Sequence, residues 1–304
     1  MIVNPSSATA TTEKKWIESR NLLIENGLEI DTLMTEKPRH AIELARNAAA
    51  GGSRKFIAAG GDGTIFEVMS GLLRYSDESG ADLGEFTLGV LPYGTGNDWI
   101  KTSLIPKDLT QAAECIARGI TAKEDVVRLT LENGTYCMSN IGGIGIDADI
   151  CHYTNALKKK GYKGSLLYKL VAPYSIFAKK AQPVEITLDG EVAYSGKIFS
   201  AVIGNGIYRG GGIKQNQEGS SWSDGLLEVS IMPGSGYIKA LQRMIHALSG
   251  DFAVQPGIIT KRFRKMTVKP LSKHPDRVEM DGEIPGTLPI TIEATGQQIN
   301  IIVP

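Results

Sequence analysis

The chain has 304 residues, of which 42% are apolar and 22% charged, and its 33 basic side chains balance 33 acidic ones. This composition is typical of a globular protein large enough for two domains, and the lack of net positive charge argues against a nucleic-acid partner. Three cysteines, an odd number without metal-type spacing, argue against a disulfide framework and a zinc site. No run approaches the roughly eighteen apolar residues of a transmembrane helix. Residues 1–5 predict a strand entering a turn and not a signal peptide, so we expect a cytoplasmic protein.

Residues 1–125 alternate between predicted strands and helices. In chain order the pattern predicts a strand at 2–3, a helix at 12–26, a strand at 30–34, a helix at 40–50, a strand at 56–59, a helix at 65–73, a strand at 88–91 and a helix at 109–118. Gly27 and Gly119 follow two of these helices, which is typical of helix C-termini. The alternation predicts an α/β domain with a doubly wound, mostly parallel sheet.

From residue 126 onward short strands dominate the pattern. They are expected at 126–131, 136–141, 184–188, 197–203, 226–232, 265–269, 278–280 and 290–292, with helices at 165–179, interrupted at Pro173, and at 237–248. Asn133-Gly134 and Asp189-Gly190 are typical hairpin turns. We therefore expect a β-rich, antiparallel, sandwich-like second domain at 126–293. The first domain is expected at 1–125, and a return of residues 294–304 to it is left open.

Two glycine-rich segments follow predicted strands of the first domain. Gly60-Gly61-Asp62-Gly63-Thr64 comes after the strand at 56–59, and Gly94-Thr95-Gly96-Asn97-Asp98 comes shortly after the strand at 88–91. Glycine turns at the carboxyl ends of strands let backbone N–H groups face a bound anion, and ligands of open α/β sheets bind at that edge. The pair predicts a phosphate site with a divalent metal. The first segment alone is equally well explained as a tight turn with Asp62 as a helix cap.

Together with Glu67, these segments resemble the catalytic domain of the diacylglycerol-kinase family, which includes sphingosine and ceramide kinases and is distantly related to NAD kinases. The resemblance extends over nearly the whole chain. Further matching positions are Asn4-Pro5, Thr35, His40-Ala41, Asp125, Asn140, Gly143, Gly145, Asp147, Gly204-Asn205-Gly206, Gly210-Gly211-Gly212, Asp224-Gly225-Leu226-Leu227 and Asp281-Gly282-Glu283. The chain departs from the family pattern at 6–9, where members place a glycine, and at 213–223, where they commonly carry Pro-x-Ala.

The resemblance implies an ATP- and Mg²⁺-dependent lipid kinase whose active site lies in the cleft between the domains. It assigns nucleotide binding to Asn4, Thr35, Gly60, Gly61, Asp62, Gly63, Thr64, Glu67, Gly94, Thr95, Asn97 and Asp98. Asp62, Asp98 and Asp125 resemble the acidic network that links the metal to the phosphates. Asp281 is the implied general base with Glu283 beside it, whereas Asp224 and Leu226 are the implied ligands of a second, structural Mg²⁺.

The lipid acceptor is left open by the sequence. Diacylglycerol, which would give phosphatidic acid, is the acceptor that the resemblance favours, but phosphatidylglycerol, a sphingoid base and a polyprenol also offer a hydroxyl. An NAD-kinase-like enzyme acting on a soluble nucleotide is one alternative, against which the long match in the second domain argues. A non-catalytic lipid- or nucleotide-binding module is another, and the complete set of carboxylates argues against it. A homodimer is also left open.

Two further patterns each have two interpretations. Lys158-Lys159-Lys160 and Lys163 precede the apolar helix at 165–179, so this region is either an ordinary solvated and packed face or a peripheral contact with an anionic membrane. Gly142-Gly143-Ile144-Gly145 lacks the spacing of a dinucleotide-binding turn. Close packing of strands is the interpretation we favour for these glycines.

Overall fold

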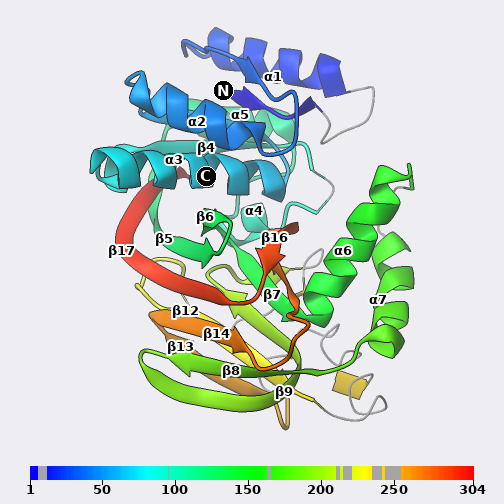
Figure 1. Cartoon of the computed structure of the whole chain (residues 1–304). Coiled ribbons are helices and arrows are strands. Elements are labelled where there is room, and N and C mark those ends of the chain that lie inside the picture. The colour runs from blue at the N-terminus through cyan, green and yellow to red at the C-terminus, as the bar shows by residue number, and fades with distance from the viewer. Residues whose placement is uncertain are drawn as a thin grey trace. The chain divides into compact units, whose positions relative to one another are not determined.

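The computed structural model describes residues 1–5, 12–94, 96–162, 166–209, 213–214, 221–234, 242–243 and 255–304. Its contacts divide the chain into two compact units. The first comprises Met1–Val126, Thr135–Ser139 and Thr295–Pro304, and the second Val127–Gly134 and Asn140–Ala294 (Figure 1). Thr95, Lys163, Gly210–Gly212 and most of the predicted helix at 237–248 lie outside the described residues. Among the helices that the structure describes, none is long and apolar enough to cross a bilayer.

The first unit is built on a parallel sheet. Its elements are β1 (Ile2–Val3), α1 (Thr12–Glu25), β2 (Leu33–Met34), α2 (His40–Ala50), β3 (Lys55–Gly60), α3 (Asp62–Ser79), η2 (Leu83–Glu85), β4 (Thr87–Pro92), α4 (Trp99–Thr102), α5 (Leu109–Arg118) and β6 (Gly134–Met138), with parts of β5 (Thr121–Leu131) and β17 (Ile290–Ile302). The strand order is β17–β4–β3–β1–β2, and each of these neighbouring pairs is parallel. The predicted α/β domain with a mostly parallel sheet is confirmed.

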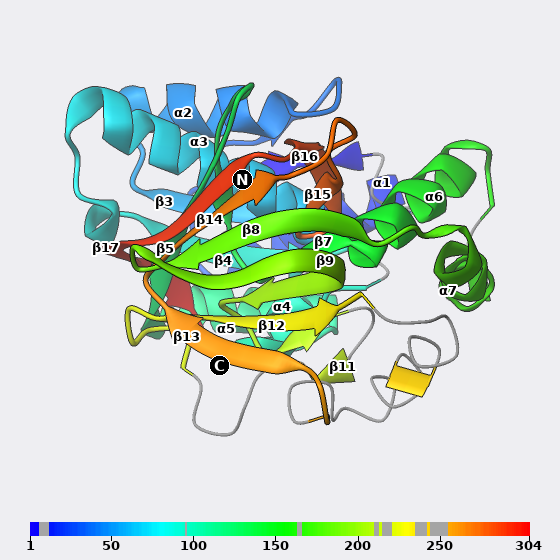
Figure 2. The same ribbon diagram turned by 60° about the horizontal axis from the view of Figure 1, so that its bottom comes forward.

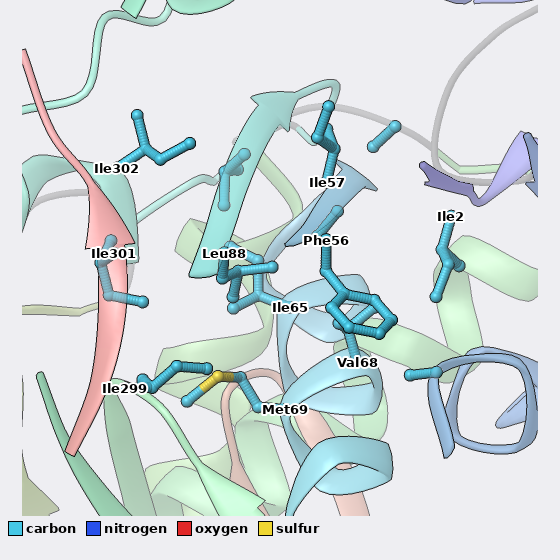
Figure 3. Packing of buried hydrophobic residues seen from close by; sticks show 14 of the residues in the cluster. Ile2, Phe56, Ile57, Ile65, Val68, Met69, Leu88, Ile299, Ile301 and Ile302 are labelled. Atoms are coloured by element: carbon cyan, nitrogen blue, oxygen red, sulfur yellow. The ribbon is translucent and has the colours of Figure 1, made fainter. Parts of the chain in front are cut away.

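The core of this unit includes buried side chains of the sheet, of α3 and of α1 and α5. In β3, every residue after Lys55 is buried, the near-continuous burial expected of a parallel strand covered on both faces. Figure 3 shows Phe56 of β3, Leu88 of β4 and Ile301 of β17 among the packed side chains, with Ile65, Val68 and Met69 of α3. The predicted end of this helix at residue 73 was wrong, because α3 continues to Ser79 and ends at Gly80, a left-handed residue with φ 76°.

The second unit is antiparallel, as predicted. Its elements are β7 (Ile141–Gly145), α6 (Ile146–Lys159), α7 (Leu166–Ala178), β8 (Gln182–Leu188), β9 (Glu191–Gly204), β10 (Tyr208–Arg209), β11 (Ile213–Lys214), β12 (Leu227–Pro233), β13 (Ile259–Phe263), β14 (Lys265–Pro270), β15 (Arg277–Met280) and β16 (Glu283–Thr287). The strands follow the order β16–β15–β7–β9–β8–β14, and β12 joins β9 to β13. Figure 2 shows the long, curved strands β8 and β9. The turn between them has φ 49° at Asp189 and 92° at Gly190, which confirms the predicted hairpin.

Helix α6 was missed by the sequence analysis. Ile146, Ile150 and Leu157 lie at helical spacing, but the glycine-rich strand that ends immediately before them obscured the change of period. Two related expectations were also wrong. The single strand predicted at 136–141 is interrupted at residues 139–140 and divides into β6 and β7, and α7 continues through Pro173 without interruption.

Candidate active site

The two glycine-rich loops of the first unit lie backbone against backbone. The carbonyl of Gly60, at the end of β3, accepts hydrogen bonds from the N–H of Tyr93 (2.9 Å) and of Gly94 (3.3 Å). A Cβ added to Gly94 would lie 2.6 Å from Cα of Gly61, and one added to Gly61 would lie 3.2 Å from Cα of Gly94. A side chain at position 94 would therefore overlap the other loop, and one at position 61 would be tightly crowded by it.

Polar side chains join the same two loops. Asp62, in the first turn of α3, accepts hydrogen bonds from the N–H of Asp98 (3.1 Å) and of Trp99 (3.3 Å). Burial raises the pKa of Asp62, against the opposing effect of these hydrogen bonds. Asn97, at φ 50°, donates from Nδ2 to the carbonyl of Gly94 at 2.7 Å. Asp98 forms an ion pair with Lys101 at 2.6 Å. The predicted neighbourhood of Asp62, Asn97 and Asp98 is thus present in the structure.

Asn4 and Thr35 lie at the ends of the next two strands of the sheet. The N–H of Asn4 donates to the carbonyl of Ala59 (3.0 Å), and its Nδ2 donates to Oγ1 of Thr64 (3.3 Å). The N–H of Thr35 donates to the carbonyl of Val3 (2.9 Å). Because β1 to β4 are parallel, their carboxyl ends share one edge of the sheet, where a ligand would meet all four loops.

Two neighbouring carboxylates on β5 have different partners. Oε1 of Glu124, which is fully buried, accepts a hydrogen bond from Nε1 of Trp99 at 3.1 Å. Asp125 accepts one from Nε2 of Gln298 at 2.9 Å. Glu124 thus binds Trp99, the residue directly after Asp98, but it was not among the predicted site residues. The sequence feature that could have pointed to Glu124 is its position next to Asp125.

Glu67 makes contacts that differ from its predicted role. Its two oxygens accept hydrogen bonds from the N–H of Arg39 and of Ala41, each at 3.0 Å. These groups belong to the first turn of α2, where Arg39, with φ 65°, provides no side-chain cap of its own. Burial raises the pKa of Glu67. These contacts are those of a helix cap supplied by another helix, and a role toward a nucleotide stays a prediction.

Asp281, in the second unit, lies on the turn between β15 and β16, directly after the strand predicted at 278–280. The turn has φ 51° at Asp281 and 84° at Gly282. Oδ1 of Asp281 accepts hydrogen bonds from the N–H of Asn140 (2.9 Å) and of Ile141 (3.0 Å). The side chain is 5% exposed. Its carboxylate is therefore held by the N–H groups at the start of β7. The simpler hypothesis was that this aspartate bonds the backbone of its own turn.

Motif residues from distant parts of the second unit converge at Asn140. Its carbonyl accepts hydrogen bonds from the N–H of Asn205 (2.8 Å) and of Gly206 (2.9 Å), while its Nδ2 donates to the carbonyl of Tyr208 (2.9 Å). In the adjoining strand, a Cβ on Gly142 would overlap the sulfur of Met280. A Cβ on Gly145 would lie 2.5 Å from the carbonyl oxygen of Phe199 in β9, so close strand packing is confirmed at Gly142 and Gly145, whereas a Cβ on Gly143 would meet Asp147 of α6.

Asp224 already has a cationic partner. One carboxylate oxygen accepts a hydrogen bond from the N–H of Leu226 at 3.0 Å, and the other forms an ion pair with Arg262. A metal ion at Asp224 would have to displace this guanidinium. Within the described part of the chain, no group of three or more His, Cys, Asp or Glu side chains could hold a metal. Asp98, beside Asp62, is likewise paired with Lys101, so Mg²⁺ there would need ligands beyond these two carboxylates, such as phosphate oxygens and several waters.

Comparisons with known proteins match both parts of the chain to family models. Residues 1–129 match the family model of the diacylglycerol kinase catalytic domain, and residues 141–303 match that of the YegS C-terminal NAD kinase beta sandwich-like domain. The chain is 28% identical to "Diacylglycerol kinase" of Bacillus subtilis (strain 168), over 100% of this chain and 95% of that protein. It is 26% identical to "Probable lipid kinase YegS-like" of Xanthomonas campestris pv. campestris (strain 8004), over 94% of this chain and 91% of that protein.

A solved structure shares the fold. The crystal structure of a diacylglycerol kinase from Bacillus anthracis str. Sterne matches with a TM-score of 0.69 and 22% identity, covering 100% of this chain and 95% of that one. The two family models account for nearly the whole length, in the same order as the two domain types described above. The chain therefore belongs to the family that joins a diacylglycerol kinase catalytic domain to a YegS-type C-terminal domain.

Proposed function

We propose that this protein is an ATP- and Mg²⁺-dependent lipid kinase, with diacylglycerol as the favoured acceptor and phosphatidic acid as the product. The observation that carries the proposal is the pair of interlocked glycine loops at the carboxyl edge of the parallel sheet, with Asp62 and Asp98 between them. The two relatives, named diacylglycerol kinase and probable lipid kinase, suggest the class of acceptor.

The first unit would bind the nucleotide. Phosphoryl transfer requires the phosphates to be held in line and their charge to be neutralised, with little covalent help from the protein. Backbone N–H groups of the loops at 60–64 and 94–98 are suited to hold phosphate oxygens, with Asn4 and Thr35 at the neighbouring strand ends. When bound, Mg²⁺ supplies the remaining charge neutralisation. Asp62, Asp98 and Asp125 are the carboxylates that we assign to it.

The second unit would supply the base. We assign to Asp281 the role of accepting the proton of the lipid hydroxyl. As that proton is transferred, the hydroxyl oxygen bonds to the γ-phosphorus and the bond from the γ-phosphorus to the ADP oxygen breaks. Two backbone N–H groups hold its carboxylate, so it needs little rearrangement to accept that proton. Glu283, two residues later at the start of β16, is the neighbouring carboxylate.

Helices α6 and α7 are our candidates for peripheral contact with an anionic membrane in the cytoplasm. The two helices lie side by side, and a groove of about 360 Å³ between them is lined by Tyr153, Leu157, Val171 and Tyr174. On α7, Tyr174 is 60% exposed and Phe177 66%. Lys158 and Lys160 are exposed at the end of α6. Exposed aromatic rings beside lysines suit the boundary between headgroups and acyl chains.

A transfer assay tests the proposed reaction. Radiolabelled ATP and Mg²⁺ would be offered with mixed micelles of diacylglycerol, phosphatidylglycerol, a sphingoid base or a polyprenol, and separately with NAD. We expect label in lipid, most in phosphatidic acid, and none in NAD. Label in NAD alone would identify the NAD-kinase-like alternative, to which the name of the second matched domain gives some weight. If the protein bound ATP but transferred phosphate to no acceptor, the non-catalytic binding module would be the remaining interpretation.

A further inference from the structure

The Asp281–Gly282 turn is held from helix α6. The carbonyl of Gly282 accepts hydrogen bonds from Nδ2 of Asn155 (2.9 Å) and from Sγ of Cys151 (3.1 Å). The N–H of Gly282 donates to Oε1 of Glu279 at 2.7 Å. Side chains thus bind the polar groups of Gly282 on both sides, and two of the three come from a helix more than 120 residues earlier in the chain.

These hydrogen bonds matter because Gly282 is the exposed half of the turn. Asp281 is buried and its N–H donates to the carbonyl of Ile141 at 2.9 Å, whereas a Cβ added to Gly282 would meet nothing within 4 Å. Asp281 has φ 51°, a conformation that residues other than glycine adopt at a cost. If the turn relaxed, the Asp281 carboxylate would move away from the N–H groups of Asn140 and Ile141. What keeps the carboxylate in place therefore includes the hydrogen bonds to Gly282.

Asn155 is the stronger of the two donors on α6. Cys151 and Asn155 are four residues apart and so face the same side of the helix. Burial raises the pKa of the Cys151 thiol, and the negative charges of Glu279 and Glu283 raise it further. The thiol therefore stays protonated and able to donate, but an S–H group is a weak donor compared with an amide N–H.

We infer that Asn155 is a positioning residue, which holds the Gly282 carbonyl so that the carboxylate of Asp281 faces the acceptor hydroxyl. This inference rests on the proposed role of Asp281 as the base. Helix α6 would then have two roles. Its C-terminal end, with Lys158 and Lys160, is our candidate for membrane contact, and Asn155, less than one turn before Lys158, would position the base.

The first test is Asn155→Ala in the full chain, assayed with ATP and short-chain diacylglycerol in micelles. We expect kcat to fall roughly tenfold, the effect of one lost hydrogen bond, with the KM for ATP and the melting temperature unchanged. Asn155→Asp, which places an acceptor against the carbonyl, should lose at least as much. Cys151→Ser, which keeps a donor, should stay within about twofold of the wild type.

A matched control is Asn26→Ala. Nδ2 of Asn26 also donates to an exposed backbone carbonyl, that of Leu22 at 2.8 Å, at the end of a helix in the other unit. We expect its kcat to equal that of the wild type. Equal losses in Asn155→Ala and Asn26→Ala would attribute the effect to helix stability and overturn the inference.

The second test repeats Asn155→Ala in an Asp281→Asn background. If Asn155 acts through Asp281, the second substitution should change kcat less than about twofold there, although it costs roughly tenfold in the wild type. The same tenfold loss in both backgrounds would overturn the inference. Full turnover by Asp281→Asn alone would instead overturn the proposed base. If Asn155→Ala turned over normally while Asp281→Asn was nearly inactive, the positioning role of Asn155 would be overturned but the proposed base would stand.

Discussion

The glycine loops of the first unit and the Asp281 turn of the second hold their carboxylates by different means. Around Asp62 the two loops touch through their backbones, and a Cβ at Gly94 would lie 2.6 Å from Cα of Gly61. Around Asp281 there is open space at Gly282, and hydrogen bonds from the N–H groups of Asn140 and Ile141, distant in the sequence, fix the carboxylate. The first region should thus be sensitive to added atoms and the second to lost polar atoms.

Gly94→Val should have the largest effect, because its side chain would force the two loops apart. We expect ATP binding to be abolished, measured by titration calorimetry on protein whose circular dichroism shows it to be folded. Gly61→Val should act in the same direction. Gly51→Ala, where a Cβ meets nothing closer than 3.4 Å, is the control and should bind normally. Unchanged ATP affinity in folded Gly94→Val would contradict the assignment of these loops to phosphate.

Asp281→Asn tests the second region by removing charge without adding atoms. We expect turnover to fall by roughly a hundredfold or more, with ATP affinity and melting temperature nearly preserved, because the amide keeps an acceptor for the two N–H groups. Asp189→Asn is a close control, since Asp189 also lies on a turn at φ 49° and accepts bonds from backbone N–H groups. If Asp281→Asn kept its turnover, Glu283 would become the candidate base.

The basic end of α6 should give a smaller, salt-dependent effect. Each basic residue near an anionic surface contributes about 1 kcal/mol, so Lys158→Glu with Lys160→Glu should weaken binding to phosphatidylserine-containing vesicles by roughly thirtyfold or more. Cosedimentation at two salt concentrations measures it. Lys269→Glu with Lys273→Glu, two exposed lysines elsewhere in the unit, is the charge-matched control. If vesicle binding changed neither with salt nor with the α6 substitutions, Lys158 and Lys160 would be ordinary solvated residues with no role in membrane binding.

The smallest expected effect concerns Asp224, whose carboxylate is occupied by Arg262. If Mg²⁺ competes for this site, Arg262→Gln should enlarge the rise in melting temperature that Mg²⁺ causes, by a few degrees. Asp224→Ala should lower the melting temperature in Mg²⁺ and reduce that rise. Differential scanning fluorimetry with Mg²⁺ or with EDTA measures both. An identical Mg²⁺-dependent rise in the wild type and both variants would remove Asp224 from any metal site.

The difference between the two regions also explains what the sequence could predict. The loops at 60–64 and 94–98 each begin within two residues of the end of a strand, so short patterns locate them and parallel strand order brings them together. The contact of Asp281 with β7 depends on antiparallel register, which no short pattern reveals. Glu67 caps α2 from α3, and Asn155 reaches Gly282 from the helix that was missed altogether. Contacts between distant elements therefore account for most of what the sequence analysis did not predict.

The position of β17 has a consequence for the order in which the chain is made. Asn300 and Ile301 pair with Thr87 and Leu88 of β4, so the strand beside β4 is translated more than 200 residues after β4 itself. Until then β4 presents an open edge while the whole second unit is synthesised, an interval of about ten seconds or longer at usual ribosome speeds. Open edges invite pairing with other chains. A fragment of residues 1–126 would keep that edge permanently, and we expect it to aggregate unless residues 295–304 are supplied as a separate peptide.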